Sequence, residues 1–409
     1  MIGRTILPFI EKGIRLKPVV LITGARQVGK TTLCKFISEK FGFDYVTLAN
    51  KDERRLAIND PDMFLRVHSH PLIIDEAQYA KGLFDSIEAL VDREMFETED
   101  SNGMYIITGS QIYQLMENIS QSMAGRVTII NVSPLSYSEI VGREEVPFKS
   151  NFENLIRRSM KHRTDVMEVY SRIIRGSYPE LYQKSEMDTS QYYSDYVDTY
   201  ISRDVTEIIN LKDRNKFLTF MEILASLTGQ ELVYERLSDA VGISKDTVKS
   251  WLGVLEMGGI IHLLPAFYNS AIKRSIKRPK LYFCDTGLAC YLAKVLDPES
   301  LRVGYLNGPM VETYIVNEIL KSYSNNCEKA GFYYYRDTNN NEIDLIVLRD
   351  GRLTLIECKA GMTYNASDVK AFSRIKGGQY EIAPSCIICL TEQAYPLKDG
   401  VYAIPVTSI

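Results

Sequence analysis

The sequence lacks a run of about eighteen apolar residues, the length that a membrane-spanning helix needs. Residues 1–10 also lack a basic segment followed by an apolar stretch and a small-residue cleavage site, so no signal peptide is predicted. We therefore expect a cytoplasmic protein with no membrane partner.

A strong charge of one sign is missing as well. The formal net charge is −4, so no global basic field draws the chain onto nucleic acid, and any nucleic-acid site has to be a local patch. The seven cysteines are odd in number and irregularly spaced, which argues against a disulfide framework. Cys386 and Cys389 form a C-x-x-C pair without a second pair of ligands at zinc spacing. We interpret this pair as part of a buried strand.

The sequence does contain an α/β pattern over its first 140 residues, where short apolar runs alternate with helical segments. Such alternation predicts a parallel sheet with helices on both faces. The predicted strands are residues 19–23, 45–48, 72–75, 104–108 and 127–132.

The remainder divides by pattern into three parts. Residues 150–210 are helical and rich in tyrosine. Residues 214–285 predict three helices followed by two strands, 260–267 and 280–283, the order found in a winged helix. Residues 286–409 begin with a helix over 311–323. The strands 332–336, 342–348, 354–359, 385–390 and 401–406 follow, with a helix over 366–375.

The strongest motif follows the first strand and opens a helix. It matches G-x-x-x-x-G-K-[ST], the P-loop pattern, whose backbone N–H groups cradle phosphates at the positive end of a helix. Lys30 is predicted to bridge the β- and γ-phosphates of ATP, and the Thr31 hydroxyl to bind Mg²⁺. The predicted nucleotide-binding residues are Gly24, Ala25, Arg26, Gln27, Val28, Gly29, Lys30, Thr31 and Thr32.

Two carboxylates end the third predicted strand. Asp75 is predicted to hold the Mg²⁺ shell, and Glu76 to polarise the attacking water as a general base. The fourth strand leads into polar residues, one of which is predicted to contact the γ-phosphate and the attacking water. Ser110 is the first choice for this contact and Thr108 the second; strand-end caps are the alternative.

Two arginines are further candidates. Arg126 is interpreted either as a finger that reaches the γ-phosphate of a neighbouring subunit, which requires a homo-oligomer, or as an ordinary salt-bridge partner. Arg175 is a candidate nucleotide sensor in the helical segment.

A second constellation lies near the C-terminus. Asp344 on one strand and Glu357 with Lys359 on the next can converge on one point, where the carboxylates would bind Mg²⁺ and the lysine would orient a water for phosphodiester cleavage. Glu312 on the preceding helix adds a third carboxylate. The alternative is two amphipathic strands with solvated charges.

Basic residues gather between the two strands of the winged-helix pattern. Residues 273–280 include five lysines or arginines, and Lys245 and Lys249 lie on the preceding helix. This hairpin suits contacts to DNA phosphates. A solvated loop, or a module that binds a protein partner, is the alternative.

With these motifs in place, the chain resembles the prokaryotic AAA+ ATPases, close to the archaeal-type ATPases, that carry a C-terminal domain of uncharacterised function. Ala25 departs from the family, which more often has proline there. The segments that carry the resemblance are 23–32, 75–78, 108–110, 124–126, 134–139, 176–179 and 196–205.

The resemblance implies an ATP-hydrolysing core over residues 1–145, a helical lid over 146–212, a winged helix over 213–285 and a restriction-endonuclease-like domain over 286–409. The leading hypothesis is a nucleotide-regulated, DNA-associated ATPase that uses ATP and Mg²⁺. A nucleotide switch with an inert protein-interaction scaffold and an ATP-gated, Mg²⁺-dependent nuclease are the two alternatives.

Overall fold

The computed structural model describes residues 2–98, 101–109, 123, 125–161, 164–200, 214–268 and 277–409. The chain divides into two compact units, each described by itself. The first is Met1–Leu135 with Ser324–Cys327, and the second is Ser136–Tyr323 with Glu328–Ile409.

The first unit is built on a five-stranded sheet in which every pairing is parallel, in the order β2-β3-β4-β1-β5. The predicted parallel α/β core is confirmed, with strand ends shifted by one residue at most. The strands are β1 (Val19–Thr23), β2 (Asp44–Thr47), β3 (Leu72–Asp75), β4 (Tyr105–Thr108) and β5 (Val127–Asn131).

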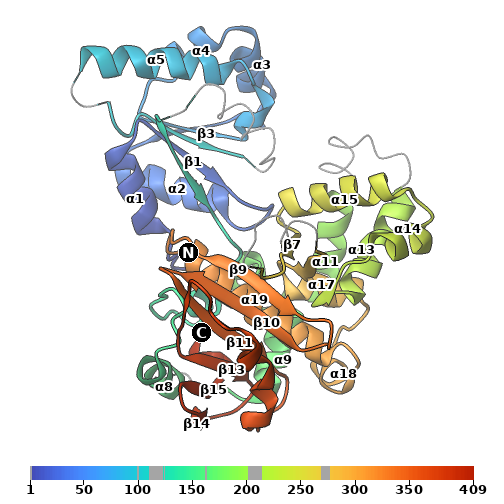
Figure 1. Cartoon of the computed structure of the whole chain (residues 1–409). Coiled ribbons are helices and arrows are strands. Elements are labelled where there is room, and N and C mark those ends of the chain that lie inside the picture. The colour runs from blue at the N-terminus through green and yellow to red at the C-terminus, as the bar shows by residue number, and fades with distance from the viewer. Residues whose placement is uncertain are drawn as a thin grey trace. The chain divides into compact units, whose positions relative to one another are not determined.

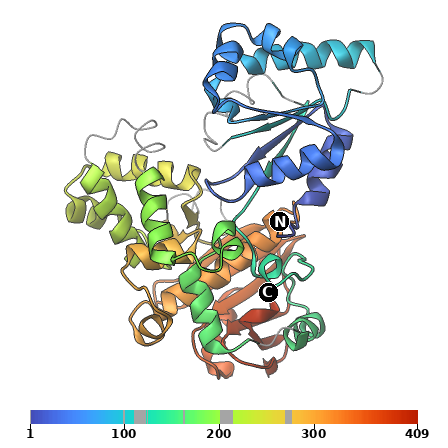
Figure 2. The ribbon, with the colours of Figure 1, turned by 180° about the vertical axis from the view of Figure 1, so that it is seen from behind.

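Helices cover both faces of this sheet, as Figures 1 and 2 show. The helices are α1 (Leu7–Leu16), α2 (Lys30–Phe41), α3 (Lys51–Asn59), α4 (Pro61–Val67) and α5 (Leu83–Glu97). Helices α1 and α2 lie on one face, and α3, α4 and α5 on the other. Strands β1, β3 and β4 are buried throughout, since apolar side chains on both of their faces meet a helical layer.

The second unit begins with helices. They are α7 (Tyr137–Ile140), α8 (Phe152–Lys161), α9 (Val166–Arg175), α10 (Pro179–Gln183) and α11 (Thr189–Tyr200). The tyrosines of this region pack together: the rings of Tyr178 and Tyr196 have centroids 4.9 Å apart, and Tyr193 donates a hydrogen bond to Asp285. Tyr178, Tyr193 and Tyr196 therefore belong to a buried core.

The next elements follow the predicted order of three helices and two strands, with one short strand added. They are α13 (Arg214–Ser226), β6 (Gln230–Glu231), α14 (Tyr234–Val241), α15 (Lys245–Met257), β7 (Ile261–Leu264) and β8 (Lys280–Phe283). Ser244 caps α15 by accepting a hydrogen bond from the Thr247 N–H. The strands form an antiparallel sheet in the order β6-β8-β7.

The C-terminal part of the second unit is a mixed sheet in the order β14-β15-β13-β11-β10-β9, with β12 beside β11. Its helices are α17 (Thr286–Leu292), α18 (Pro298–Val303) and α19 (Asn307–Ser324). The strands are β9 (Gly331–Arg336), β10 (Glu342–Arg349), β11 (Arg352–Cys358), β12 (Glu381–Ile382), β13 (Ser385–Cys389), β14 (Tyr395–Lys398) and β15 (Val401–Pro405).

Two local expectations in this part can be compared with the structure. The helix predicted over 366–375 is a 3₁₀ helix, Ala366–Arg374, with a non-helical residue at Val369. The predicted helix is therefore present, one residue shorter and in 3₁₀ form. Cys386 and Cys389 lie buried on β13 as free thiols, as the strand interpretation predicted. Among the described residues, no helix combines the length and hydropathy needed to cross a membrane.

Candidate functional site

The loop between β1 and α2 has the backbone conformation of a phosphate cradle. Gly24 has a φ of 143° and Gly29 a φ of 95°, both disfavoured for residues with a side chain. A Cβ at Gly24 would lie 2.3 Å from the carbonyl oxygen of Val132, so any side chain there would collide with the backbone. Gly29 is the N-cap of α2, which places the positive end of the helix beside the loop.

The ammonium group of Lys30 lies inside this loop. Its Nζ donates hydrogen bonds to the carbonyl oxygens of Gly24 at 2.8 Å and Ala25 at 2.7 Å. Burial lowers the pKa of Lys30 to about 8, although the carboxylates of Glu76 and Asp75 oppose this change. The cation is thus held at the place where the phosphates of a nucleotide would meet the loop.

This lowered pKa predicts that ATP affinity depends on pH. Bound phosphates favour the ammonium form of Lys30, so ATP binding above pH 8 has to be accompanied by proton uptake. The dissociation constant for ATP should therefore rise as pH increases above 8, by at most about tenfold per pH unit. Lys30→Arg, which stays charged, should show a flatter profile over the same range. A fluorescent-nucleotide titration measures the dissociation constant at each pH. If wild type and Lys30→Arg showed the same dependence on pH, the effect would not originate from Lys30.

Asp75 ends β3 and lies within hydrogen-bonding distance of Thr31. The Thr31 hydroxyl donates to Oδ2 of Asp75 at 3.3 Å, and the Tyr45 hydroxyl donates to the same oxygen at 2.6 Å. Burial raises the pKa of Asp75, while these hydroxyl donors oppose the increase. The sequence prediction did not include Tyr45. Its position on β2, the strand that pairs with β3, was the available signal.

Glu76 follows Asp75 in the left-handed region, with a φ of 57°. Its carboxylate accepts a hydrogen bond from the side-chain amide of Gln78. Thr108 ends β4, the strand between β1 and β3. Its hydroxyl is buried and has no hydrogen-bond partner among the described residues. Ser110, the first choice for this sensor position, lies outside the described residues.

These residues fit a nucleotide with Mg²⁺. Lys30 supplies a cation inside a cradle of backbone groups, and Thr31 with Asp75 supplies the oxygen ligands that Mg²⁺ prefers. The unpartnered Thr108 hydroxyl offers one more polar contact at the same edge of the sheet. The donor set therefore matches the chemistry of phosphates and a hard cation.

Both candidate arginines bind groups of their own chain. The Arg126 guanidinium contacts Asp92, at 2.7 Å between Nη2 and Oδ2, and Glu88 at 3.3 Å. Arg126 immediately precedes β5, which runs parallel to β1. It therefore lies at the amino-terminal end of the strands, whereas the P-loop of the same chain follows the carboxyl end of β1. Nε of Arg175 donates to the carbonyl oxygen of Leu181 at 3.1 Å.

The second unit brings the predicted C-terminal constellation together. Lys359 Nζ lies 2.7 Å from Oε2 of Glu357 and 3.4 Å from Oδ2 of Asp344. The Cys358 N–H donates to Asp344 at 2.9 Å. Glu312 on α19 joins this group through Lys280, which pairs with both Glu312 and Asp344. The two strands therefore do not simply carry solvated charges, because Asp344 and Glu357 are buried.

Lys280 corrects one part of the hairpin prediction. It was expected either to contact DNA phosphates as part of the basic hairpin or to lie in a solvated loop, whereas it is buried on β8 with a side chain 3% exposed. Its Nζ lies 2.9 Å from Glu312 and 3.5 Å from Asp344, and it also pairs with Glu342. Glu342 was missed as a site residue, although its spacing of two from Asp344 places both on one face of β10. Residues 273–276 lie outside the described residues.

Burial and charge shape the protonation of this cluster. Burial and the charge of Asp344 raise the pKa of Glu357 to about 9 and that of Glu312 to about 7. Burial also favours protonation of Asp344, but Lys280 and Lys359 outweigh it and hold its pKa below the usual range. Among the described residues, no three histidine, cysteine or carboxylate side chains form a ligand group for one metal ion. Two ammonium groups instead pair with the carboxylates.

Removing the Lys280 ammonium should destabilise the second unit. Lys280→Met removes the ammonium partner of Glu312 and one of the two ammonium partners of Asp344, which costs about 3–5 kcal/mol. Urea unfolding can be followed through Trp251, the single tryptophan, which packs in the second unit against Phe217 and Phe220. The control Lys277→Met alters an exposed residue and should stay within about 0.5 kcal/mol of wild type. Equal transitions for Lys280→Met and wild type would show that the pairing is not stabilising.

Comparison with protein-family models finds three matches. Residues 16–141 match an AAA domain. Residues 167–299 match a domain of unknown function, DUF8612, and residues 307–409 match another, DUF4143. The AAA match spans the P-loop, Asp75 and Glu76.

Two relatives with detectable sequence similarity are uncharacterized proteins. One from Mycobacterium bovis is 26% identical over 401 residues, covering 98% of this chain and 82% of the relative. One from Haemophilus influenzae is 23% identical over 257 residues, covering 61% of this chain and 58% of the relative. Among solved structures, a Walker-type ATPase of Pyrococcus abyssi has 13% identity and a TM-score of 0.43, and covers 70% of this chain and 94% of its own.

Proposed function

We propose that this chain, which carries an AAA domain over residues 16–141 and a DUF4143 domain over residues 307–409, binds and hydrolyses ATP with Mg²⁺. The observation that carries the proposal is the approach of Thr31 to Asp75, at 3.3 Å, beside the lysine of a phosphate cradle. Thr31 comes from α2 and Asp75 from the end of β3, and the two residues are 44 positions apart. Their meeting supplies a ligand pair suited to Mg²⁺ next to the cradle.

Each residue of the site has a role that follows from its place. Backbone N–H groups of residues 24–31 bind the phosphates, and the Lys30 ammonium neutralises charge on the β- and γ-phosphates. Thr31 and Asp75 would hold Mg²⁺, which supplies further charge neutralisation when bound. Glu76 accepts a proton from the attacking water, and Thr108 donates a hydrogen bond toward the γ-phosphate.

The test is ATP turnover by wild type and Lys30→Ala, each measured without DNA, with double-stranded DNA and with single-stranded DNA. Turnover that depends on Lys30 supports the ATPase. An equal rate in the variant would assign the activity to a contaminant or to another site.

The same assay tests a finer proposal, that the ATPase is regulated by nucleotide and associated with DNA. Its support is the helical segment with an adjacent antiparallel hairpin in the second unit, in which α15 carries the exposed Lys249. Lys245, at the start of α15, is paired with Glu235 at 2.9 Å, which weakens its case as a phosphate contact. DNA should raise ATP turnover. No stimulation by either DNA form, together with no binding at low salt, would contradict DNA association.

A second candidate function is an ATP-gated nuclease, favoured by the convergence of Asp344, Glu357 and Lys359. Phosphodiester cleavage would have to depend on Mg²⁺ and be lost in Lys359→Ala. Cleavage that persists unchanged in this variant would remove the candidate. The pairing of Lys280 with Asp344 and with Glu312 weighs against a standing metal site here.

A further inference from the structure

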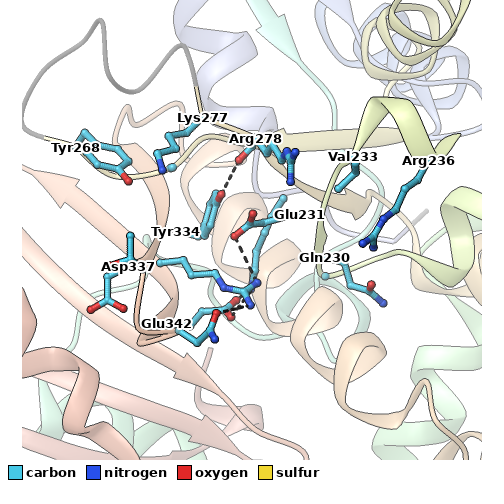
Figure 3. Close-up of a pocket in the computed structure, with 16 residues that line it drawn as sticks. Gln230, Glu231, Val233, Arg236, Tyr268, Lys277, Arg278, Tyr334, Asp337 and Glu342 are labelled. Atoms are coloured by element: carbon cyan, nitrogen blue, oxygen red, sulfur yellow. Dashed lines mark hydrogen bonds and ion pairs between the residues drawn. The ribbon is translucent and has the colours of Figure 1, made fainter. Parts of the chain in front are cut away.

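We propose that a cavity in the second unit binds a single-stranded segment of nucleic acid. The cavity has a volume of about 610 Å³, within the range of small-ligand sites. One wall comes from β6, α14 and the segment that leads into β8, and the other from β9, β10 and the turn between them (Figure 3). This inference rests on the proposed DNA association and names the form of nucleic acid and its site.

The lining carries an excess of positive charge in a chain whose net charge is negative. Its cationic residues are Arg236, Lys277, Arg278, Lys280 and Arg336, and its acidic residues are Glu231, Asp337 and Glu342. Five cations against three carboxylates leave a surplus of two. A local patch of this kind is what the acidic chain would need in order to hold phosphates.

The three carboxylates already have partners within the fold. Glu231 pairs with Arg336 at 3.5 Å, and Glu342 pairs with Lys280. Asp337 accepts hydrogen bonds from the backbone N–H groups of Asn339 and Asn341 inside the turn. Arg236, Lys277 and Arg278 are exposed, and none of them takes part in these contacts. Their charges are therefore directed to the cavity and the solvent.

An aromatic ring in the cavity wall favours binding of a single strand over a duplex. Tyr268 is half-buried at the cavity wall, and Nζ of Lys277 lies 5.7 Å from its ring centroid. Unpaired bases stack on aromatic rings, whereas a duplex hides its base faces. Tyr334 is buried, and its hydroxyl donates to the carbonyl oxygen of Arg278, so it fixes the wall and is not a stacking platform. The combination of exposed cations and one ring favours a single strand.

The cavity continues into the site of the C-terminal carboxylates. A second cavity, of about 470 Å³, is lined by Glu312, Asp344, Glu357 and Lys359. Four residues line both: Gly229, Lys280, Asn340 and Glu342. A strand held by Arg236 and Arg278 would thus lead toward the Asp344 site.

The test measures the fluorescence anisotropy of labelled oligothymidine and oligouridine of about 12 nucleotides, a length within known site sizes, and of a matching duplex. The full-length wild type is compared with Arg236→Gln/Arg278→Gln. Loss of two phosphate contacts should weaken single-strand binding about tenfold and reduce the slope of log K against log salt by about 1.4. The control Arg352→Gln/Lys398→Gln removes two exposed charges that do not line the cavity and should bind as wild type does.

Tyr268→Ala should weaken single-strand binding about tenfold, and Tyr268→Phe should retain it, since stacking requires the ring alone. The DNA and RNA arms show which strand is preferred. Equal affinity in the cavity double variant and its control, or no binding at all, would overturn the proposal. If the protein bound duplex more tightly than single strands, and Tyr268→Ala did not change that affinity, the cavity site would be overturned while DNA association would stand. If DNA did not change ATP turnover, coupling between DNA binding and ATP hydrolysis would be contradicted, and the cavity site would stand.

Discussion

Glu76→Gln is expected to lower the rate of ATP hydrolysis about 10²- to 10⁴-fold while ATP still binds. Glutamine keeps the size and hydrogen-bonding reach of the side chain but cannot accept the proton of the attacking water. The affinity should survive because Lys30, Thr31 and Asp75, which hold the nucleotide in this account, are unchanged. Single-turnover hydrolysis and a fluorescent-nucleotide titration separate the two effects.

Glu97→Gln is the matched control, since Glu97 is exposed on α5. This variant should hydrolyse ATP at the wild-type rate. If Glu76→Gln instead lost affinity and rate together, Glu76 would have a binding role. If its rate were unchanged, another residue would act as the base.

Lys30→Ala is expected to reduce ATP turnover by roughly 10²- to 10³-fold, the effect of removing one preorganised charge from a phosphoryl-transfer site. Nucleotide affinity should fall as well, because the ammonium group lies inside the cradle. Lys40→Ala is the control on the same helix: its ammonium pairs with Glu11 at 2.7 Å. Equal turnover in Lys30→Ala and Lys40→Ala would show that the loop is not the catalytic nucleotide site.

The nucleotide site could be predicted because its signals are local. Gly24, Gly29 and Lys30 are fixed by a short motif, and strand periodicity placed Asp75 at the end of β3. The parallel order of β1, β4 and β3 brings Thr31 and Asp75 to one edge, as the two motifs together implied. Tyr45 escaped prediction because its contact with Asp75 depends on β2 lying next to β3, an order that periodicity alone does not give.

The surroundings of Lys280 illustrate what local patterns leave open. A basic run before a strand is typical of a solvated loop, and four of its five cations precede β8. The fifth belongs to the strand, where alternation places Lys280 and Tyr282 on one face. That face meets Glu312 from α19, a contact 32 residues away that no spacing rule predicts. Burial of the cation thus follows from tertiary packing.

The role of Arg126 is likewise not determined by local sequence patterns. The sequence left two roles open, and the structure pairs its guanidinium with Asp92 and Glu88 on α5. The position before β5 keeps it away from the P-loop of its own chain. A role as an arginine finger between subunits stays a prediction that requires a homo-oligomer.

The most direct test of the central claim is phosphate release from ATP by purified wild type beside Glu76→Gln, with Mg²⁺ and with a chelator. The account predicts steady release by wild type that requires Mg²⁺ and disappears in the variant, while both proteins bind ATP. Equal release by the two proteins would contradict the assigned site. Binding without release by wild type would contradict hydrolysis and leave a nucleotide-binding protein.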